Sequence, residues 1–291
     1  MLLSTNTGSF TKRFTIEEAV SMIADAGFDA IDISFFNDDT FYKVDPDTPS
    51  VAARLKNLRA LAESKGVVFN QAHGPNPSSV ADEAKNPLIF ENIVRCMKSA
   101  AMLGAPHIVI HPMQHLTYSE DGVPEKLFEI NMDFYGRLLP YCKAFGIKVA
   151  LENMWQMPRG KKIDHSTCSR PAEFIRYLDA LDKEWFIGCL DIGHAFLVSE
   201  DPADFIRALG KNRLKALHVH DVDGFDDLHT LPYLGSINWA KTMKALGEIG
   251  YTGDFTYEAG KFLSAFPNEN FPAALSFMES VGRGLMKKTG Q

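Results

Sequence analysis

Residues 186–196 read FIGCLDIGHAF, an apolar, β-prone run that ends at Asp191 and is followed three residues later by His194. Five other apolar runs also end in a metal-capable side chain, at roughly even spacing along the chain. They are VVFNQAH (67–73), HIVIH (107–111), KVALE (148–152), LKALH (214–218) and DFTYE (254–258). One histidine or carboxylate after a strand is common, but six in succession favour parallel strands that bring their polar ends to one face.

The segments between these runs have the periodicity of amphipathic helices. Residues 16–26, for example, place apolar side chains on one helical face and stop at Gly27. Pro171 and Pro202 suit first helical turns, because the backbone N–H that proline lacks would have no partner within the helix there. We therefore expect helices at residues 16–26, 51–65, 92–103, 125–145, 171–181, 202–209, 239–249 and 272–286.

Two further strands, LLST (2–5) and AIDI (30–33), bring the pattern to eight strands that alternate with eight helices. Such alternation is typical of right-handed βαβ units and a parallel sheet. Eight units within 291 residues fit the α/β class as a single (β/α)₈ TIM barrel, with one domain over residues 1–291. No GxGxxG or GxxxxGK[ST] motif follows a strand, so a doubly wound nucleotide-binding fold has little support.

The composition limits the kinds of partner and compartment that we expect for this protein. The chain is 45% hydrophobic and 23% charged, and no apolar stretch approaches the ~20 residues of a membrane span. The net charge of −7 disfavours a nucleic-acid partner without excluding it. With no signal peptide apparent and no CxxC pair among the cysteines, we expect a reduced, cytoplasmic protein, and a homo-oligomer stays open. The cysteines are Cys96, Cys142, Cys168 and Cys189, the last inside a predicted strand.

The polar residues at the strand ends form a candidate metal site. His194 lies where a turn brings it back towards Asp191, and Asp227 and His229 flank Leu228 in a loop where both side chains can point the same way. Imidazoles and carboxylates together suit Mn²⁺, Zn²⁺, Co²⁺ or Fe²⁺. Nine candidates are too many for one ion and about right for two or three. They are His73, His111, Glu152, Asp191, His194, His218, Asp227, His229 and Glu258.

The motifs LEN (151–153), LDIGHAF (190–196), HVHD (218–221), DLH (227–229) and YE (257–258) resemble those of the xylose isomerase-like TIM barrels. That superfamily joins sugar isomerases and epimerases to endonuclease IV-type AP endonucleases. In the epimerase branch, the resemblance implies one divalent ion, often Mn²⁺, held by the residues matching Glu152, Asp191, His218 and Glu258. It also implies that the two glutamates act as the acid/base pair and that His194 hydrogen-bonds a substrate oxygen. In the AP endonuclease branch, a three-zinc cluster uses positions matching all nine candidates.

Strand alternation puts His218 and His220 on the same face, so periodicity does not choose between them. The family's H-x-x-D pattern, here His218 with Asp221, favours His218 and keeps His220 as the reserve. His107 begins its strand at the opposite end of the barrel and is expected to be structural. Five aromatic residues suit either the apolar wall of a sugar pocket or ordinary barrel packing: Phe10, Phe35, Phe36, Trp155 and Phe196.

Three functions compete. The first is a metal-dependent isomerase or epimerase of a sugar, sugar phosphate or related polyol, with Glu152, Glu258 and His194 as its catalytic residues and Mn²⁺, Zn²⁺ or Co²⁺ as one to three bound ions. The second is a zinc-dependent AP endonuclease. Asn76 follows HGP where that branch carries a DNA-penetrating tyrosine, which weakens this alternative. The third is a barrel that binds metal and ligand without turnover. Two opposed glutamates are unnecessary for binding alone, so the first function is preferred.

Overall fold

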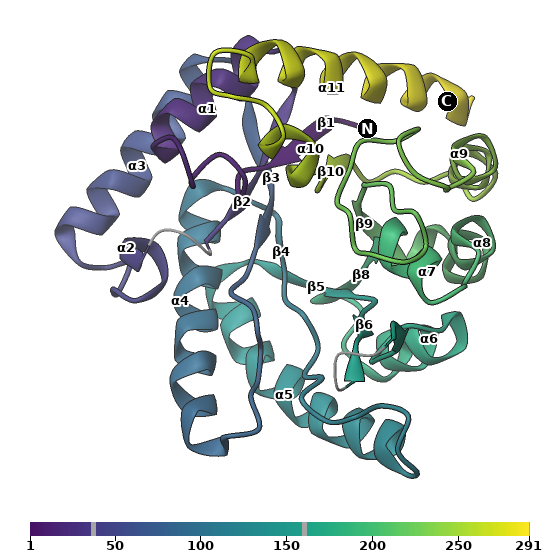
Figure 1. The fold of residues 1–291 in the computed structure, drawn as a ribbon. Coiled ribbons are helices and arrows are strands. Elements are labelled where there is room, and N and C mark those ends of the chain that lie inside the picture. The colour runs from purple at the N-terminus through teal and green to yellow at the C-terminus, as the bar shows by residue number, and fades with distance from the viewer. Residues whose placement is uncertain (36–38, 159–161, 291) are drawn as a thin grey trace.

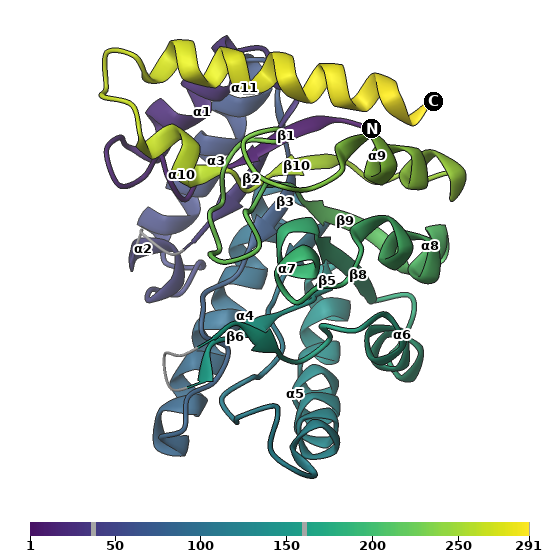
Figure 2. The ribbon, with the colours of Figure 1, turned by 45° about the vertical axis from the view of Figure 1, so that its right-hand side comes forward.

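The computed structural model describes residues 1–35, 39–158 and 162–290. Eight parallel strands form a nearly closed barrel that helices surround (Figure 1, and Figure 2 after a turn of 45°). Every run predicted as a strand is one, so the (β/α)₈ fold is confirmed. The barrel strands are β1 (Leu3–Asn6), β2 (Ala30–Ser34), β3 (Val68–His73), β4 (His107–Val109), β5 (Lys148–Glu152), β8 (Phe186–Asp191), β9 (Leu214–His218) and β10 (Phe255–Tyr257).

The barrel closes between β9 and β10. The strand order is β10-β1-β2-β3-β4-β5-β8-β9, with parallel pairing throughout. At the remaining seam, the backbone N–H of Val219 donates to the Thr256 carbonyl at 2.9 Å, and that of Glu258 donates to the Val219 carbonyl at 3.1 Å. These bonds lie directly after His218, so they hold the polar ends of β9 and β10 in a defined register.

The eight predicted helices cover the outside of the barrel, and their ends lie within six residues of the predicted ones. The clearest difference is α4, which begins at Asn86 rather than at residue 92, because Pro87 is tolerated in a first turn. Among the described residues, none of the helices is both long and apolar enough to cross a membrane. The helices are α1 (Ile16–Asp25), α3 (Pro49–Ser64), α4 (Asn86–Leu103), α5 (Val123–Phe145), α6 (Pro171–Ala180), α8 (Pro202–Arg213), α9 (Trp239–Glu248) and α11 (Phe271–Met286).

Several short elements were not predicted. The most important is α7 (Ile192–Leu197), which starts where β8 ends, because the Asp191 carboxylate accepts the backbone N–H of His194 at 2.7 Å as an N-cap. One residue therefore ends a strand, starts a helix and turns His194 back over the strand end. The other short elements are α2 (Asp39–Tyr42), the hairpin of β6 (Trp155–Gln156) and β7 (Asp164–His165), α10 (Gly260–Ser264), and the 3₁₀ turns η1 (Glu83–Lys85) and η3 (Lys287–Thr289).

A chain of polar side chains runs through the barrel interior. His107, at the start of β4, hydrogen-bonds the Gln71 side-chain oxygen at 3.1 Å, and the Gln71 amide donates to Asp32 at 3.3 Å. Asp32 also accepts from Asn6 at 2.8 Å, and its Oδ2 atom lies 3.9 Å from Nε2 of His218. The chain thus links the end of the barrel away from the site to the strand end at His218. Cys189, which lies in β8 as predicted, packs in this interior with Val109 and Ala150.

The structural role expected of His107 predicts a pH effect on stability. Burial lowers the pKa of His107 to about 4 from an ordinary 6.5. The folded state therefore resists the proton that the unfolded chain accepts, and this histidine's contribution to stability is lost as the pH falls from 6.5 towards 4. Between about pH 7.5 and about pH 5, it should reduce the free energy of unfolding by about 2 kcal/mol.

His107→Gln keeps a side-chain amide near Gln71 and removes the titration. Urea unfolding at both pH values should show a smaller acid-induced loss of stability in the variant than in the wild type. Lys56→Gln, at an exposed lysine on α3, is the control. Equal pH dependence in the wild type and His107→Gln would contradict the prediction.

Candidate metal centre and active site

The strand-end residues predicted from the sequence lie together at the C-terminal mouth of the barrel. Four are the last residues of β3, β5, β8 and β9, a fifth directly follows β10, and the sixth lies two residues beyond β4. They are His73, Glu152, Asp191, His218, Glu258 and His111. Parallel strands deliver these side chains to one place although they are far apart in the sequence.

Four of these residues form what we call the central group: Glu152, Asp191, His218 and Glu258. One nitrogen or oxygen atom from each lies within 4.8 Å of the others. Nδ1 of His218 is 3.1 Å from Oε1 of Glu152 and 3.3 Å from Oε2 of Glu258, and Oδ2 of Asp191 is 4.0 Å away. Glu152, Asp191 and His218 are fully buried, whereas the Glu258 side chain is 19% exposed.

His73 and His111 flank Glu152 on its other side. Nε2 of His111 lies 3.1 Å from Oε2 of Glu152, and Nε2 of His73 lies 3.8 Å from the same oxygen. The two ring nitrogens are 3.2 Å apart. One oxygen of Glu152 therefore faces His218 and the other faces the histidine pair, an arrangement in which this carboxylate can serve two neighbouring ligand sets.

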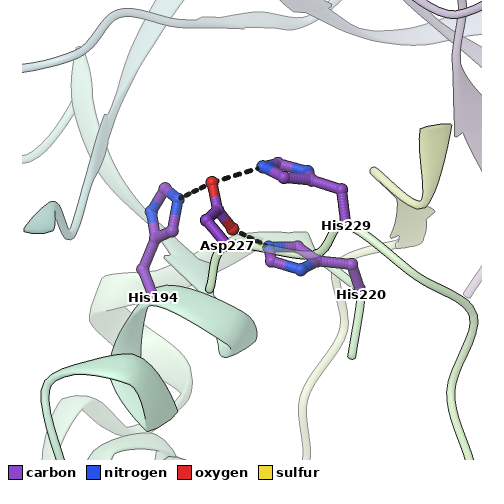
Figure 3. A group of neighbouring side chains, drawn as sticks. All are labelled: His194, His220, Asp227 and His229. Atoms are coloured by element: carbon purple, nitrogen blue, oxygen red, sulfur yellow. Dashed lines mark hydrogen bonds and ion pairs between the residues drawn. The ribbon is translucent and has the colours of Figure 1, made fainter. Parts of the chain in front are cut away.

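A second set of side chains, the loop group, consists of His194, His220, Asp227 and His229 (Figure 3). Asp227 lies between the rings: its Oδ2 is 2.8 Å from Nε2 of His229 and 3.8 Å from Nε2 of His194. Its Oδ1 is 4.0 Å from Nε2 of His220. The predicted trio of His194, Asp227 and His229 is thus assembled in space, and His220 joins it.

Three of the histidines have a defined orientation. Nδ1 of His73, His194 and His229 lies 2.8–2.9 Å from a backbone carbonyl, that of Gly74, Asn153 and Glu258 respectively. A carbonyl only accepts, so Nδ1 carries the proton and donates it, and Nε2 is the nitrogen that faces the site. Outer hydrogen bonds of this kind orient histidine ligands in metal sites.

The structure separates the roles of His218 and His220, which periodicity left open. His218 points its Nδ1 into the central group. His220 places its Nε2 3.0 Å from both oxygens of Asp191, so it orients that carboxylate by hydrogen bonding. This position requires Gly193, since a Cβ there would lie 2.1 Å from the His220 ring.

Buried carboxylates and imidazoles offset one another's charge here. Burial would raise the pKa of Glu152, but His218 and His111 outweigh it and hold the pKa well below its usual range. Burial lowers and Asp227 raises the pKa of His229, with a net rise to about 9. Cationic partners are therefore needed to keep these carboxylates ionised, and either protons on the histidines or a metal ion supply that charge.

The central group fits a divalent metal ion. Among the described residues, both oxygens of Glu152 and both ring nitrogens of His218 are buried and lack a hydrogen-bond partner of proper geometry. Buried polar atoms without partners are unfavourable, so their gathering at one point indicates a ligand that they share. Mixed imidazole and carboxylate donors suit Mn²⁺, Zn²⁺ or Co²⁺.

Three residues around the site were not singled out by the sequence analysis for the roles they have. Asp32 faces His218, and the only signal was a charged residue inside an apolar strand, AIDI. Asn153 exchanges two hydrogen bonds with the Asp191 backbone and orients His194. Asp221, which the H-x-x-D pattern paired with His218, instead accepts the Tyr233 and Ile237 amides and the Trp239 indole N–H, so it organises the loop that carries Asp227 and His229.

A cavity of about 450 Å³, the main cavity, opens over the metal candidates. Trp155 contributes to its wall as the sequence allowed, together with Met154 and Met157. Phe10 and Phe35 are instead fully buried in the hydrophobic core, and Phe196 packs against that core. Phe36 lies outside the described residues.

The chain belongs to the xylose isomerase-like TIM barrel family, whose model matches residues 20–281. An uncharacterized protein of Methanocaldococcus jannaschii is 27% identical over 246 residues, which cover 84% of this chain and 79% of that protein. The sequence resemblance to this family is therefore confirmed.

Solved structures share the fold over the whole chain. A D-tagatose 3-epimerase-like protein superposes with a TM-score of 0.75 at 21% identity, covering 100% of both chains. The IolI protein with a bound zinc atom also gives a TM-score of 0.75, at 16% identity and 99% coverage of both chains. At these identities the likeness establishes the barrel fold alone.

Substitutions in the central group and in the loop group should have different effects on metal binding. Glu152→Gln removes a carboxylate that faces both His218 and the histidine pair, so it should weaken binding of the tightest divalent ion at least about tenfold. His229→Gln removes a ligand of the loop group and none of the central group, so it should leave that ion in place. Metal analysis of the purified proteins after dialysis against limiting chelator measures both outcomes.

His115→Gln, at a histidine outside both groups, is the control and should match the wild type. Loss of all bound metal in His229→Gln, or full retention in Glu152→Gln, would contradict the assignment of the central group as the tighter site.

Proposed function

We propose that the protein is a divalent-metal-dependent isomerase or epimerase that acts on a sugar or a closely related polyol. One observation carries the proposal: carboxylate oxygens of Glu152 and Glu258 lie 3.1 and 3.3 Å from Nδ1 of His218, and both residues line the main cavity. Two carboxylates at one ligand pocket can remove a proton and return it.

Mn²⁺, Zn²⁺ or Co²⁺ would be held by Glu152, Asp191, His218 and Glu258, with His73 and His111 beside them. When bound there, the ion supplies Lewis acidity, which polarises a substrate carbonyl and its neighbouring hydroxyl and so acidifies the C–H between them. Asp191 is held for this purpose by His220 and by the backbone of α7.

The two glutamates transfer the proton. One carboxylate removes the proton from the carbon next to the carbonyl, and the bonding pair moves into the carbonyl to leave an enediolate. Return of a proton to the same carbon from the opposite glutamate inverts its configuration, which is epimerisation. Return to the former carbonyl carbon, together with a proton shift between the two oxygens, is aldose–ketose isomerisation. Glu258, as the more exposed of the pair, has the readier access to substrate.

His194 orients the substrate in this proposal. Its Nδ1–H is committed to the Asn153 carbonyl, so Nε2 faces the main cavity, where it can contact a substrate oxygen. The wall of Trp155 and the two methionines suits the apolar face of a sugar ring or chain. The epimerase-like and zinc-containing structures of the same fold support this proposal.

Exchange of carbon-bound hydrogen with solvent tests the proton transfer. Metal-loaded protein in D₂O with a panel of ketoses and aldoses should place deuterium on carbon, which NMR detects. Glu152→Gln and Glu258→Gln should each lower the exchange rate by about 10²- to 10⁴-fold, because each removes an acid/base group. Glu184→Gln, at an exposed residue far from the mouth, is the matched control.

Circular dichroism and metal content of each variant separate chemistry from folding and from loss of the ion. No exchange with any sugar in the metal-loaded wild type would refute the proposal. Unchanged exchange in a folded Glu258→Gln would remove its acid/base role.

The loop group favours a second candidate function, zinc-dependent cleavage at abasic sites in DNA. Eight of the nine predicted ligands lie in adjoining sets that could hold ions, and His111 lies beside Glu152. Clustered ions promote phosphodiester hydrolysis. The net charge of −7 opposes this function. If the sugar function is correct, plasmid carrying abasic sites should stay intact with zinc-loaded protein; chelator-sensitive nicking that His229→Gln abolishes would favour the second candidate.

A further inference from the structure

A second cavity of about 280 Å³, which we call the side pocket, adjoins the main cavity. His229 and Glu258 line both, so the side pocket begins where the proposed proton transfer takes place. Its remaining wall comes from the loop after β1, the end of β2 and α10. No residue of the central or loop group other than these two contributes to it.

The side pocket carries positive charge. Lys12 and Lys261 line it, and Glu258 is the only acidic side chain among its described lining residues. The ammonium of Lys261 donates to the Asp227 carbonyl, and two of its three N–H donors remain for another acceptor. The Glu258 carboxylate turns towards the histidines, with Oε2 3.3 Å from His218 and Oε1 3.8 Å from His73.

The hydroxyls of Ser9 and Ser34 are a second feature of the side pocket. Ser34, at the end of β2, is 4% exposed, and within the described part of the chain neither its Oγ nor the buried Oγ of Ser9 has a hydrogen-bond partner. A buried hydroxyl without a partner is unfavourable. Both can donate to an oxygen-rich anion, so their position beside two lysines points to a ligand of that chemistry.

The wall of the side pocket is preorganised. Asn6 donates to Asp32 at 2.8 Å and accepts the backbone N–H of Gly8 at 2.7 Å, which shapes the turn that carries Ser9. The Ser34 amide donates to the Thr7 hydroxyl at 2.9 Å. On the far side, Arg13 donates to the Ser264 carbonyl at 2.8 Å and joins this loop to the end of α10. A ligand therefore meets a site that is already formed.

We propose that the side pocket binds the phosphate monoester of a phosphorylated sugar, whose reacting carbons then lie in the main cavity. This inference rests on the proposed isomerase or epimerase function. Two lysines match the dianion, and the serine hydroxyls match the several oxygens of a tetrahedral phosphate. A carboxylate offers one charge and two oxygens to the same donors. A DNA phosphodiester also carries one charge, and its chain continues in both directions.

Binding of inorganic phosphate to the metal-loaded, full-length protein tests the site directly. In isothermal titration calorimetry, Lys12→Ala should raise the dissociation constant about tenfold, since a charge-assisted contact is lost. Lys12→Arg should largely restore binding. Lys56→Ala, at an exposed lysine on α3, should match the wild type. No binding at millimolar phosphate, or equal affinity in Lys12→Ala and the wild type, would overturn the proposal; the latter would mean that phosphate binds only at the metal.

Deuterium exchange with matched pairs of free and phosphorylated ketoses links the side pocket to turnover. The phosphorylated member should have the higher kcat/KM, and Lys12→Ala should reduce this preference about tenfold through KM, whereas Lys56→Ala should leave it unchanged. Equal use of both members would overturn the side-pocket proposal and leave the proposed function standing. Phosphate binding that depends on Lys12, without exchange of any sugar, would refute the proposed function and not the anion site.

Competition with a short abasic DNA duplex tests whether the side pocket binds a phosphodiester instead of a phosphate monoester. Failure of the duplex to displace bound phosphate supports the monoester. Competition by the duplex that is stronger than that of any sugar phosphate, and that Lys12→Ala abolishes, would overturn the monoester in favour of a phosphodiester.

Discussion

Compensation of one buried negative charge organises this structure. The carboxylate of Glu152 is fully buried at the end of β5, and an isolated charge in that place would be strongly destabilising. His218 approaches one of its oxygens and His111 the other, each from a different strand. The strands that carry these side chains must therefore end at the same height in the barrel. The backbone hydrogen bonds of Val219 between β9 and β10 help to fix this alignment.

The barrel and most of the site were predictable because their signals are local. An apolar run followed by a polar residue identifies a strand end, and parallel strands with helical crossovers place all such ends on one face. His73, Glu152, Asp191 and Glu258 needed only this rule, whereas the choice of His218 over His220 came from the family's H-x-x-D pattern. Metal dependence and the acid/base roles of the glutamates are not contained in the fold, and they stay proposals supported by the donor set.

The rest depended on distances that no local pattern encodes. His218 and His220 share a strand face, and their roles separate only because α7 approaches His220 closely enough to exclude any side chain at Gly193. Asp32 lies in an ordinary strand sequence, and its closeness to His218 arises from barrel curvature. The side pocket likewise combines the loop after β1 with α10, segments from opposite ends of the chain that lie side by side in Figures 1 and 2.

Asp221 anchors both ends of the loop after β9. Its carboxylate receives donors from Val222 at one end of the loop and from Ile237 and Trp239 at the other. The turn at Phe225 reaches outward, with that side chain 80% exposed. Further along the loop, Lys261 of α10 donates to the Asp227 carbonyl and His229 donates to the Glu258 carbonyl. The exposed turn is thus the part of the loop whose length or composition can change without displacing Asp227 or His229.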